Sequence, residues 1–389
     1  MSRFLFHSLP LTGHVYPIAA VAQELARRGH EVAWVGVESV LRPLLGPQAQ
    51  VYPTGLPLYR GELRDRGMTA TRSRWKGYIV PHTRFTLPAV QRAVADFGPD
   101  AVAVDQHAIA GALAAHRAGV PWATLAPTSM EIARPFAGLP KVEAWIEGVL
   151  ASLWTGAGLP GEPPYDLRFS PYLVLAFTGE ALAGTAVAGR AVLVGPALSA
   201  RPGQADFPWD RLAADRARVL VTAGTLALDT ADGFHARVVD ALAPLGDRLQ
   251  AVVVAPEEPA PGAYPPHVLV RRQVPMLELM PHLSAVVTHG GLNTVCEALA
   301  HGVPLVVAPI TSDQPVNAAQ VVAAGAGVRV RFGRSTAPQL REAVLTVLDQ
   351  PGYRQAAQRV AASFRQAGGA VAAADRLARL PGTAAGAAA

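Results

Sequence analysis

Several features are scarce in this sequence of 389 residues. It has one cysteine, Cys296, which excludes a disulfide framework and a cysteine-based zinc site and fits a reducing compartment. Lysine occurs only as Lys76 and Lys141, so nearly all of the 34 basic residues are arginines. Against 29 acidic residues they leave a formal net charge of +5. This excess is ordinary for the length and argues against nucleic-acid binding.

Long apolar runs are missing as well. Stretches such as 304–310 are far shorter than the ~18–20 residues of a membrane-spanning helix. The apolar N-terminus is interrupted by His7, Gly13 and His14, unlike a signal peptide. We therefore expect a cytoplasmic protein without stable membrane insertion, which leaves room for peripheral contact.

Several motifs of catalysis and phosphate binding are absent. There is no G-x-x-x-x-G-K-[ST] loop, no G-x-S-x-G turn of a hydrolase and no D-x-D pair that would chelate a metal against a diphosphate. The glycines at 325 and 327 lead into a predicted strand rather than a helix, so they do not form a dinucleotide fingerprint.

The remaining sequence alternates short β-rich runs with helical segments, and half of its residues are apolar. This pattern predicts an α/β fold of two doubly wound domains with parallel sheets. A stretch rich in Pro, Ala and Asp, 196–216, is predicted to be the linker. Strands are expected at 3–9, 31–37, 101–105, 121–126 and 192–195 before it, and at 219–222, 250–255, 267–271, 285–288, 304–308 and 328–331 after it. Helices are expected at 108–118, 233–243, 293–301, 315–324 and 358–380, with a frayed tail at 381–389.

The first candidate site is the stretch 10–17, which we predict to be a loop between the first strand and the first helix. Such loops border the ligand crevice of an open α/β sheet. His14, with an ordinary pKa of about 6.5, can accept a proton there, or it can be hydrogen-bonded into a turn. Asp105 ends another strand of the same sheet. Its carboxylate can hold the second ring nitrogen of His14 or cap the following helix.

The second candidate site is the segment 289–294, HGGLNT, which joins a predicted strand to a predicted helix. Its two glycines let a ligand approach the backbone, and the positive end of the helix favours an anion such as a diphosphate. Asn293 and Thr294 can donate to phosphate or cap the helix.

Further polar groups lie near this segment. Glu297 follows Asn293 by one helical turn, where it can reach a ribose hydroxyl. Asp313 and Gln314 follow the next predicted strand and offer acceptors for sugar hydroxyls. Thr225 adds a hydroxyl to the tight turn after the first strand of the second domain.

Two parts of the first domain have alternative interpretations. The segment 59–84 holds seven basic and two acidic residues, which favours a mobile, solvated loop with a short helix over a lid or a contact with an anionic surface. Aromatic residues between 55 and 159 indicate either a pocket for a lipophilic acceptor or ordinary core.

Together these motifs resemble the GT-B nucleotide-sugar glycosyltransferases of family 1, over essentially the whole chain. HGGLNT, Glu297 and PITSDQP look like the donor signature of that family, and Val104–Gln106 and AGGAVAAAD at 367–375 extend the likeness. Macrolide-type transferases of bacteria and zeaxanthin glucosyltransferases are the most similar members.

The resemblance implies a role for each candidate residue. His14 would deprotonate an acceptor hydroxyl, and Asp105 would orient its ring. No cofactor and no metal would be needed, because the helix N-terminus would stabilise the leaving diphosphate. The nucleotide-sugar donor would be bound by Thr225, Gln273, Val274, His289, Gly290, Gly291, Asn293, Thr294, Glu297, Asp313 and Gln314.

The resemblance also implies an architecture and an activity. Residues 1–205 would bind the acceptor and 206–365 the nucleotide sugar, in two Rossmann-like domains facing across a cleft. Residues 366–389 would carry a helix that packs back on the first domain. The implied activity is inverting transfer of a sugar, expected to be glucose from a UDP- or dTDP-sugar, to a hydroxyl of a lipophilic small molecule. A polyketide, macrolide or carotenoid of natural-product or antibiotic biosynthesis fits that description.

One departure from the family pattern concerns the nucleobase. Many members have an aromatic residue before Val-Pro-Gln, whereas this chain has Gln273 before Val-Pro-Met. The backbone of Val274 can still pair with a pyrimidine, but without the aromatic residue the choice between uridine and thymidine stays open.

Two other functions also remain open at this point. A GT-B-fold sugar-nucleotide epimerase would use the donor residues without needing a base paired with Asp105. A non-catalytic partner of another transferase would tend to lose the base or the donor residues. The identity of the acceptor, transfer to oxygen or nitrogen, and a monomeric or homodimeric state are not specified by the sequence.

Overall fold

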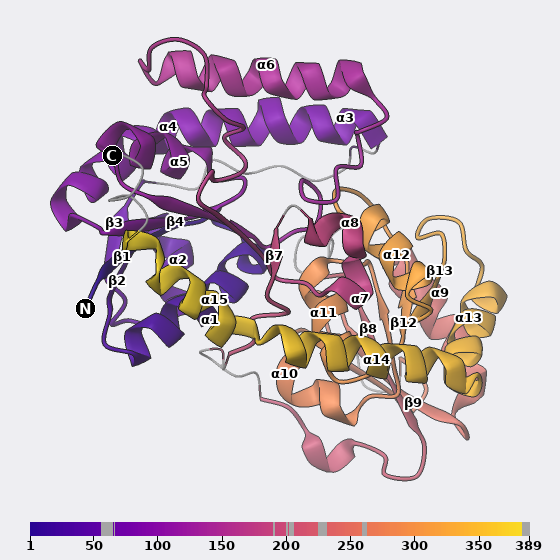
Figure 1. The fold of residues 1–389 in the computed structure, drawn as a ribbon. Helices are drawn as coiled ribbons and strands as arrows, with labels where there is room; N and C mark the ends of the chain where they lie inside the picture. Colours follow the sequence, from indigo (N-terminus) through magenta and orange to yellow (C-terminus); the bar gives the residue numbers. More distant parts are fainter. Residues whose placement is uncertain are drawn as a thin grey trace. The chain divides into compact units, whose positions relative to one another are not determined.

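The chain forms two compact units, each built on one parallel sheet (Figure 1). Unit 1 comprises Met1–Gly61, Met68–Pro202 and Gln366–Ala389, and unit 2 comprises Glu62–Gly67 and Gly203–Arg365. The predicted fold class, two doubly wound α/β domains, is confirmed. The computed structural model describes residues 1–55, 65, 67–189, 191–199, 201, 206–224, 232–258 and 263–382. Among the helices in these ranges, none combines the length and the apolar character that a membrane span requires.

Unit 1 contains a seven-stranded sheet in the order β3-β2-β1-β4-β5-β6-β7, with parallel neighbours throughout. Strand β4 has the predicted bounds. Such strands are buried on both faces and therefore read as continuous apolar runs. The strands are β1 Arg3–His7, β2 Glu31–Gly36, β3 Val51–Pro53, β4 Ala101–Asp105, β5 Trp122–Ala126, β6 Leu173–Ala176 and β7 Val192–Leu193.

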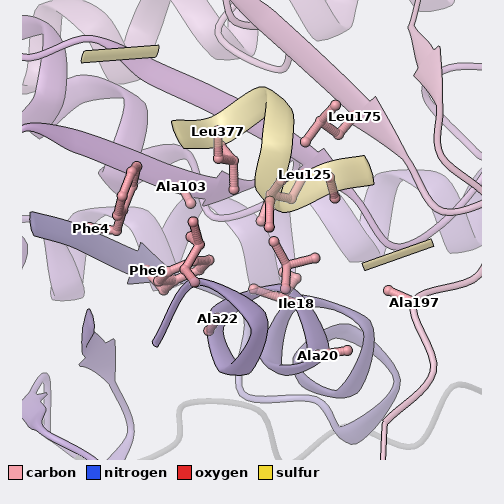
Figure 2. Close-up of a cluster of buried hydrophobic side chains, with 14 of the residues drawn as sticks. Phe4, Phe6, Ile18, Ala20, Ala22, Ala103, Leu125, Leu175, Ala197 and Leu377 are labelled. Atoms are coloured by element: carbon pink, nitrogen blue, oxygen red, sulfur yellow. The ribbon is translucent and has the colours of Figure 1, made fainter. Parts of the chain in front are cut away.

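Helices cover both faces of this sheet. Because side chains alternate along a strand, Phe4 and Phe6 of β1 pack with Ile18 and with Leu377 on one face (Figure 2), while Leu5 packs on the other. The first face is covered by α1 and α15 and the second by α4 and α5. The helices of unit 1 are α1 Thr12–Arg27, α2 Glu38–Leu45, α3 Gly67–Arg72, α4 Val80–Phe97, α5 Ile109–Ala118, α6 Pro140–Gly156, α7 Glu180–Ala183, α8 Thr185–Ala188 and α15 Gly369–Ala378.

Unit 2 contains a six-stranded parallel sheet in the order β10-β9-β8-β11-β12-β13. Helices α9 and α13 bury one of its faces. The strands are β8 Ala217–Thr222, β9 Leu249–Val254, β10 Val268–Arg271, β11 Ala285–Thr288, β12 Leu305–Val307 and β13 Gly327–Arg329. The helices are α9 Asp232–Leu242, α10 Met276–Leu279, α11 Leu292–Ala300, α12 Gln314–Ala323, α13 Ala337–Asp349 and α14 Pro351–Ala367.

Each sheet has one point where the direction of strand order reverses. In unit 1 this point lies between β1 and β4, which pair with His7 opposite Val104. In unit 2 it lies between β8 and β11, which pair with Thr222 opposite Thr288. Ligands of open α/β sheets bind at the carboxyl ends of the strands on either side of such a point. The fold therefore marks one place in each unit where a ligand site is expected.

Two local predictions were wrong. The stretch 10–17 is not a loop, because α1 already begins at Thr12 and includes His14 and Pro17. The backbone N–H groups of His14 and Val15 bond the Leu11 carbonyl, which starts the helix despite the glycine and proline that suggested a loop. Likewise, the part of segment 59–84 from Gly67 onward is helical, and a π-helical stretch, Ser73–Ile79, joins α3 to α4. Residues 59–64 and 66 lie outside the described residues.

Candidate functional site

The first candidate site lies at the strand-order reversal of unit 1. His14 is in the first turn of α1, directly after β1, and Asp105 is the last residue of β4. The structure brings the two side chains together, with 2.7 Å between His14 Nδ1 and Asp105 Oδ2. The His14 side chain retains 12% exposure and that of Asp105 none. The imidazole is therefore fixed on its inner edge and reaches solvent on its outer edge.

The Asp105 carboxylate is held by more than His14. The Ser8 hydroxyl and the Leu9 N–H each donate to Oδ2 over 3.1 Å, and the His107 N–H donates to Oδ1 over 3.0 Å. Burial alone would raise the pKa of Asp105, but His14 and His107 outweigh burial and hold this pKa well below its usual range. The carboxylate is thus ionised and accepts a hydrogen bond from His14 Nδ1–H, which leaves Nε2 as the basic nitrogen.

The second candidate site lies at the strand-order reversal of unit 2. His289, Gly290 and Gly291 connect β11 to α11 in a sharp turn. The Thr288 hydroxyl accepts from the Gly290 N–H over 3.3 Å, and Asn317 Nδ2 donates to the Gly290 carbonyl over 2.8 Å. Gly290 has a φ of 90°, and a Cβ there would lie 2.6 Å from Val307. This turn therefore requires glycine for both its conformation and its packing.

The His289 ring packs between two glycines. A Cβ on Gly291 would lie 2.8 Å from Nε2, and one on Gly224, which follows β8 with a φ of 73°, would overlap the ring. Burial lowers the pKa of His289 to about 4, so the ring is neutral at pH 7 even though one part of it reaches solvent. The histidine thus offers hydrogen bonds rather than a charge in this structure.

The N-cap residue of α11 provides no side-chain cap. Gly291 is the N-cap residue, with Asn293 and Thr294 at the second and third helical positions. Neither of these two residues therefore stands at the N-cap position of the helix. First-turn N–H groups of an α-helix have no partner within the helix, and without a capping side chain they attract an anion. Glu297 lies further along α11 and is buried.

The loop after β12 holds the third group of predicted residues. Gln314 Oε1 accepts from the Ile310 and Thr311 N–H groups over 2.8 and 3.0 Å, and Asp313 Oδ2 accepts from Asn317 over 2.9 Å. Ser312, which directly precedes Asp313, has a φ of 60°, which is rare for a residue other than glycine. Gln314 Oε1 thus shapes this loop. Within the described part of the chain, Gln314 Nε2 and Asp313 Oδ1 are the side-chain atoms left to meet a ligand.

The structure gives fewer contacts for the remaining residues that were predicted to bind the donor or the acceptor. Gln273 is exposed and Val274 half-buried in the turn between β10 and α10. Thr225 lies outside the described residues. Of the aromatic residues proposed for an acceptor pocket, Trp75 and Trp154 are buried core.

Sequence reasoning missed several residues that support these sites, and His107, which bonds Asp105, is one of them. Asn317 joins the glycine turn of β11 to Asp313, and its position one helical turn after Asp313 was the available signal. Glu131 and Arg168 form a buried pair over 2.6 Å, and Glu131 Oε1 lies 3.2 Å from His107 Nε2. Nothing in the local pattern around 131 or 168 indicated that they would meet behind Asp105.

Two family models match parts of the chain. The model described as Glycosyltransferase family 28 N-terminal domain matches residues 12–124, in unit 1. The model described as Erythromycin biosynthesis protein CIII-like, C-terminal domain matches residues 236–371, mostly in unit 2. The matched ranges include the predicted residues around both strand-order reversals, apart from those near Thr225.

Relatives and solved structures match nearly the full length. The 4'-demethylrebeccamycin synthase of Lentzea aerocolonigenes is 30% identical over 425 residues, which cover 92% of this chain and 94% of the relative. The demethyllactenocin mycarosyltransferase of Streptomyces fradiae is 29% identical, over 96% of this chain and 86% of the relative. A crystal structure of the glycotransferase of kitacinnamycin is similar with a TM-score of 0.80 and 25% identity, over 97% of this chain and 99% of that chain.

Proposed function

The chain belongs to the GT-B glycosyltransferases of family 1, and from this premise we propose that it is an inverting enzyme that glycosylates a lipophilic natural product. The donor is a nucleoside-diphosphate sugar, and the acceptor atom is a hydroxyl oxygen. The observation that carries this proposal is the contact of 2.7 Å between His14 and the buried Asp105 carboxylate.

His14 acts as the general base. Asp105 fixes the tautomer with the proton on Nδ1 and stabilises the imidazolium that forms when Nε2 takes up a second proton. The bonds from Ser8, Leu9 and the His107 N–H prevent the carboxylate from turning away. A positioned base of this kind contributes about 10²–10⁴-fold to the rate.

Unit 2 binds the donor. The N–H groups at the start of α11 and the two glycines receive the diphosphate, with Asn293, Thr294 and Thr225 as further donors and His289 beside them. Glu297 binds the ribose, and the turn at Gln273 and Val274 binds the base. The uncapped helix N-terminus supports this assignment, because the departing diphosphate is the group whose charge grows during the reaction.

The reaction is a single displacement. The acceptor oxygen gives its proton to His14 Nε2 and forms a bond to the anomeric carbon from the face opposite the leaving group. The bond from that carbon to the diphosphate oxygen breaks, and its electron pair leaves with the nucleoside diphosphate. An α-linked donor therefore gives a β-glycoside, and no metal ion is required for these steps.

Asp313 and Gln314 recognise the sugar through its hydroxyl groups. One offers an acceptor oxygen and the other a donor amide, which suits a sugar with neighbouring hydroxyls such as glucose. The name of the Streptomyces fradiae relative gives mycarose as its sugar, so a deoxysugar donor is the direct competitor in the test. The name of the same relative also gives demethyllactenocin, which supports a natural product as the acceptor. The Lentzea aerocolonigenes relative is named as the synthase of 4'-demethylrebeccamycin, which supports a natural product as the product of the reaction.

The test is incubation of the full chain with UDP-glucose, dTDP-glucose and a dTDP-deoxysugar, each against a panel of polyketide, macrolide and carotenoid aglycones. Mass spectrometry identifies the product, and the coupling constant of its anomeric proton gives its configuration. We expect a β-glucoside with at least one acceptor. An α-glycoside formed from an α-linked donor would contradict the single displacement, and preference for the deoxysugar would contradict the role given to Asp313 and Gln314.

A donor incubated alone separates the alternatives. Conversion of the donor to an epimer without acceptor would favour the sugar-nucleotide epimerase. The absence of any product with all donors and acceptors, while the nucleotide still binds, would favour a non-catalytic partner protein.

A further inference from the structure

A second histidine lies beside the His14–Asp105 pair. His107 follows β4 by two residues, its side chain is buried, and its ring centroid is 5.9 Å from that of His14. One ring nitrogen of each histidine and one carboxylate oxygen of Asp105 all lie within 4.8 Å of one another. Three side chains with lone pairs thus converge on one point at the carboxyl end of the sheet.

The His107 ring is fixed from behind by an ion pair. His107 Nε2 lies 3.2 Å from Glu131 Oε1, and Glu131 Oε2 accepts from Arg168 over 2.6 Å. Arg168 is held in turn by Asp166, over 2.7 Å. Since Glu131 is an acceptor here, His107 carries its proton on Nε2 and keeps the lone pair on Nδ1. Metal-binding histidines in proteins typically donate their other ring N–H to a carboxylate in this way.

The third converging group is equally well supported. Asp105 Oδ2 accepts from the Ser8 hydroxyl and the Leu9 N–H, so the carboxylate keeps its direction without His14. Two histidine nitrogens and one carboxylate oxygen, with a water as fourth ligand, form a common tetrahedral zinc shell. The same donor set suits Co²⁺ and Ni²⁺ and is unlike the all-oxygen shells of Mg²⁺ and Ca²⁺.

We propose that His14, Asp105 and His107 bind a divalent transition-metal ion of the zinc type, which inhibits the enzyme by occupying its base. Ligands of a tetrahedral ion with bonds of about 2.1 Å are roughly 3.4 Å apart. The His14–Asp105 pair therefore has to open by about 0.7 Å beyond its hydrogen-bond distance. His14 gives its Nδ1 proton to water and takes one up on Nε2, so the ring stays neutral and Nε2 can no longer act as the base. An ion bound there removes the link between His14 and Asp105 on which the orientation of the base depends.

The binding test uses Co²⁺ as the probe, because tetrahedral Co²⁺ absorbs visible light. Full-length protein freed of metal with a chelator is titrated with Co²⁺, and Zn²⁺ is then added to displace it. We expect one saturable site in the wild type and at least tenfold weaker binding in His107→Gln. His30→Gln is the matched control. His30 lies in the same unit, directly before β2 and thus at the amino end of the strands, and it accepts a hydrogen bond from the Ser2 N–H. Binding that is absent in the wild type, or unchanged in His107→Gln, would overturn the proposal.

A second variant covers the case in which His107→Gln fails to fold, as judged by circular dichroism. Glu131→Gln keeps every proposed metal ligand and removes the charge of the carboxylate that binds both His107 and Arg168. Loss of such a supporting group typically costs 10–100-fold in metal affinity. An unchanged affinity in this variant would contradict the described orientation of His107 and with it the proposed site.

The inhibition rests on the proposed function, whereas the binding does not. In a transfer assay, Zn²⁺ should inhibit the wild type over the concentration range in which it displaces Co²⁺. His107→Gln, with each rate taken relative to that protein's own metal-free rate, should need at least tenfold more Zn²⁺ for the same inhibition. Equal inhibition of both proteins would overturn the inhibitory role. If no transfer is found with any acceptor, the proposed function fails, and the Co²⁺ titration still decides whether the metal binds.

Discussion

The candidate sites at the strand-order reversals of the two sheets are built from different chemical groups. In unit 1 the site consists of side chains: His14, Asp105 and, behind them, Glu131 and Arg168, linked by hydrogen bonds and charge. In unit 2 it consists mainly of backbone: two glycines in a sharp turn and the uncapped N-terminus of α11. Under the proposed function, the same topological position thus presents a base in one unit and a binding site for an anion in the other.

The difference follows from what each partner of the reaction needs. Taking a proton requires one atom whose basicity is set by its neighbours, and side chains provide this. Receiving a diphosphate requires several N–H donors at fixed positions, and backbone provides these without the entropy cost of ordering side chains. Unit 1 should therefore be sensitive to single polar atoms and to charge, and unit 2 to shape.

The largest effect is expected for the base. His14→Ala removes the proton acceptor, and Asp105→Asn leaves the ring without an ionised partner, so each should lower kcat by about 10²–10⁴-fold. Nucleotide affinity, measured by isothermal titration calorimetry, should stay within about twofold of wild type, because neither side chain is in unit 2.

The control for this pair of variants is His30→Ala, in the same unit but at the amino end of the strands. It should keep full turnover. Unchanged turnover in His14→Ala would remove the base from the mechanism, and a large loss of nucleotide affinity would break the division of labour between the two units.

The second-largest expected effect concerns stability and the charge of Glu131, whose carboxylate binds His107. Burial alone would raise the pKa of Glu131, but its bonds to His107 and its charge contacts with Arg168 and Arg74 lower this pKa from 4.5 to about 2. The folded state therefore favours the ionised form. The resulting stability is complete above pH 4.5 and is lost as the pH falls from there toward 2, by roughly 3 kcal/mol.

Urea denaturation of wild type and Glu131→Gln between pH 2 and pH 6 measures this contribution. The difference in unfolding free energy between the two proteins should be large at pH 6 and shrink as the pH falls. Glu38→Gln, in an exposed pair with Arg42, should differ little from wild type at any pH. A difference for Glu131→Gln that stays constant with pH would mean that packing rather than charge holds this network together.

How much of these sites the sequence predicts depends on where each residue lies. Strand β4 was predicted to the residue, because a buried parallel strand is a continuous apolar run that ends at its first charged residue, Asp105. Placing His14 near Asp105 then needed only the rule that parallel strands end at the same edge. Likewise, the glycines of 289–294 pointed to the turn before α11 that the structure contains.

Tertiary contacts were beyond this reasoning. Glu131 and Arg168 meet from connections 37 residues apart, and no local periodicity encodes such a pairing. The start of α1 at Thr12 was missed because Gly13 and Pro17 indicate a loop, whereas burial of Val15 and Ile18 against the sheet favours the helix. The packing of Gly224 against His289 joins two strands that are neighbours only in the folded sheet.

The third effect tests the shape of the anion site. Gly224→Ala adds a Cβ that overlaps the His289 ring, at a φ of 73° that side chains other than glycine rarely adopt. We expect nucleotide affinity to fall roughly tenfold, since the ring and the turn next to it must move, while kcat at saturating donor falls less. Backbone strain itself costs about 1–2 kcal/mol of stability.

The matched control is Gly325→Ala. Gly325 has a similar φ of 69°, but a Cβ there would be in ordinary contact with Ala356, 3.7 Å away. This variant should have the same strain and normal nucleotide affinity. Equal losses of affinity in both variants would mean that strain, and not the position of His289, explains the effect.

The smallest expected effect concerns nucleotide binding, and it tests whether a charged side chain of unit 2 contributes to it. Burial lowers the pKa of His289 to about 4 in the absence of a ligand, and a diphosphate bound beside the ring favours its protonated form and so raises this pKa. Binding then takes up a proton, so nucleotide affinity rises as the pH falls. Between pH 7.5 and pH 6 the ratio of wild-type to His289→Gln affinity should therefore increase. The ratio cancels the protonation of the nucleotide, which both proteins share.

Calorimetry in two buffers of different ionisation enthalpy measures the proton uptake directly. A flat ratio with no uptake would leave His289 a purely steric and hydrogen-bonding element, and would make the contrast between a charged site in unit 1 and a shaped site in unit 2 complete.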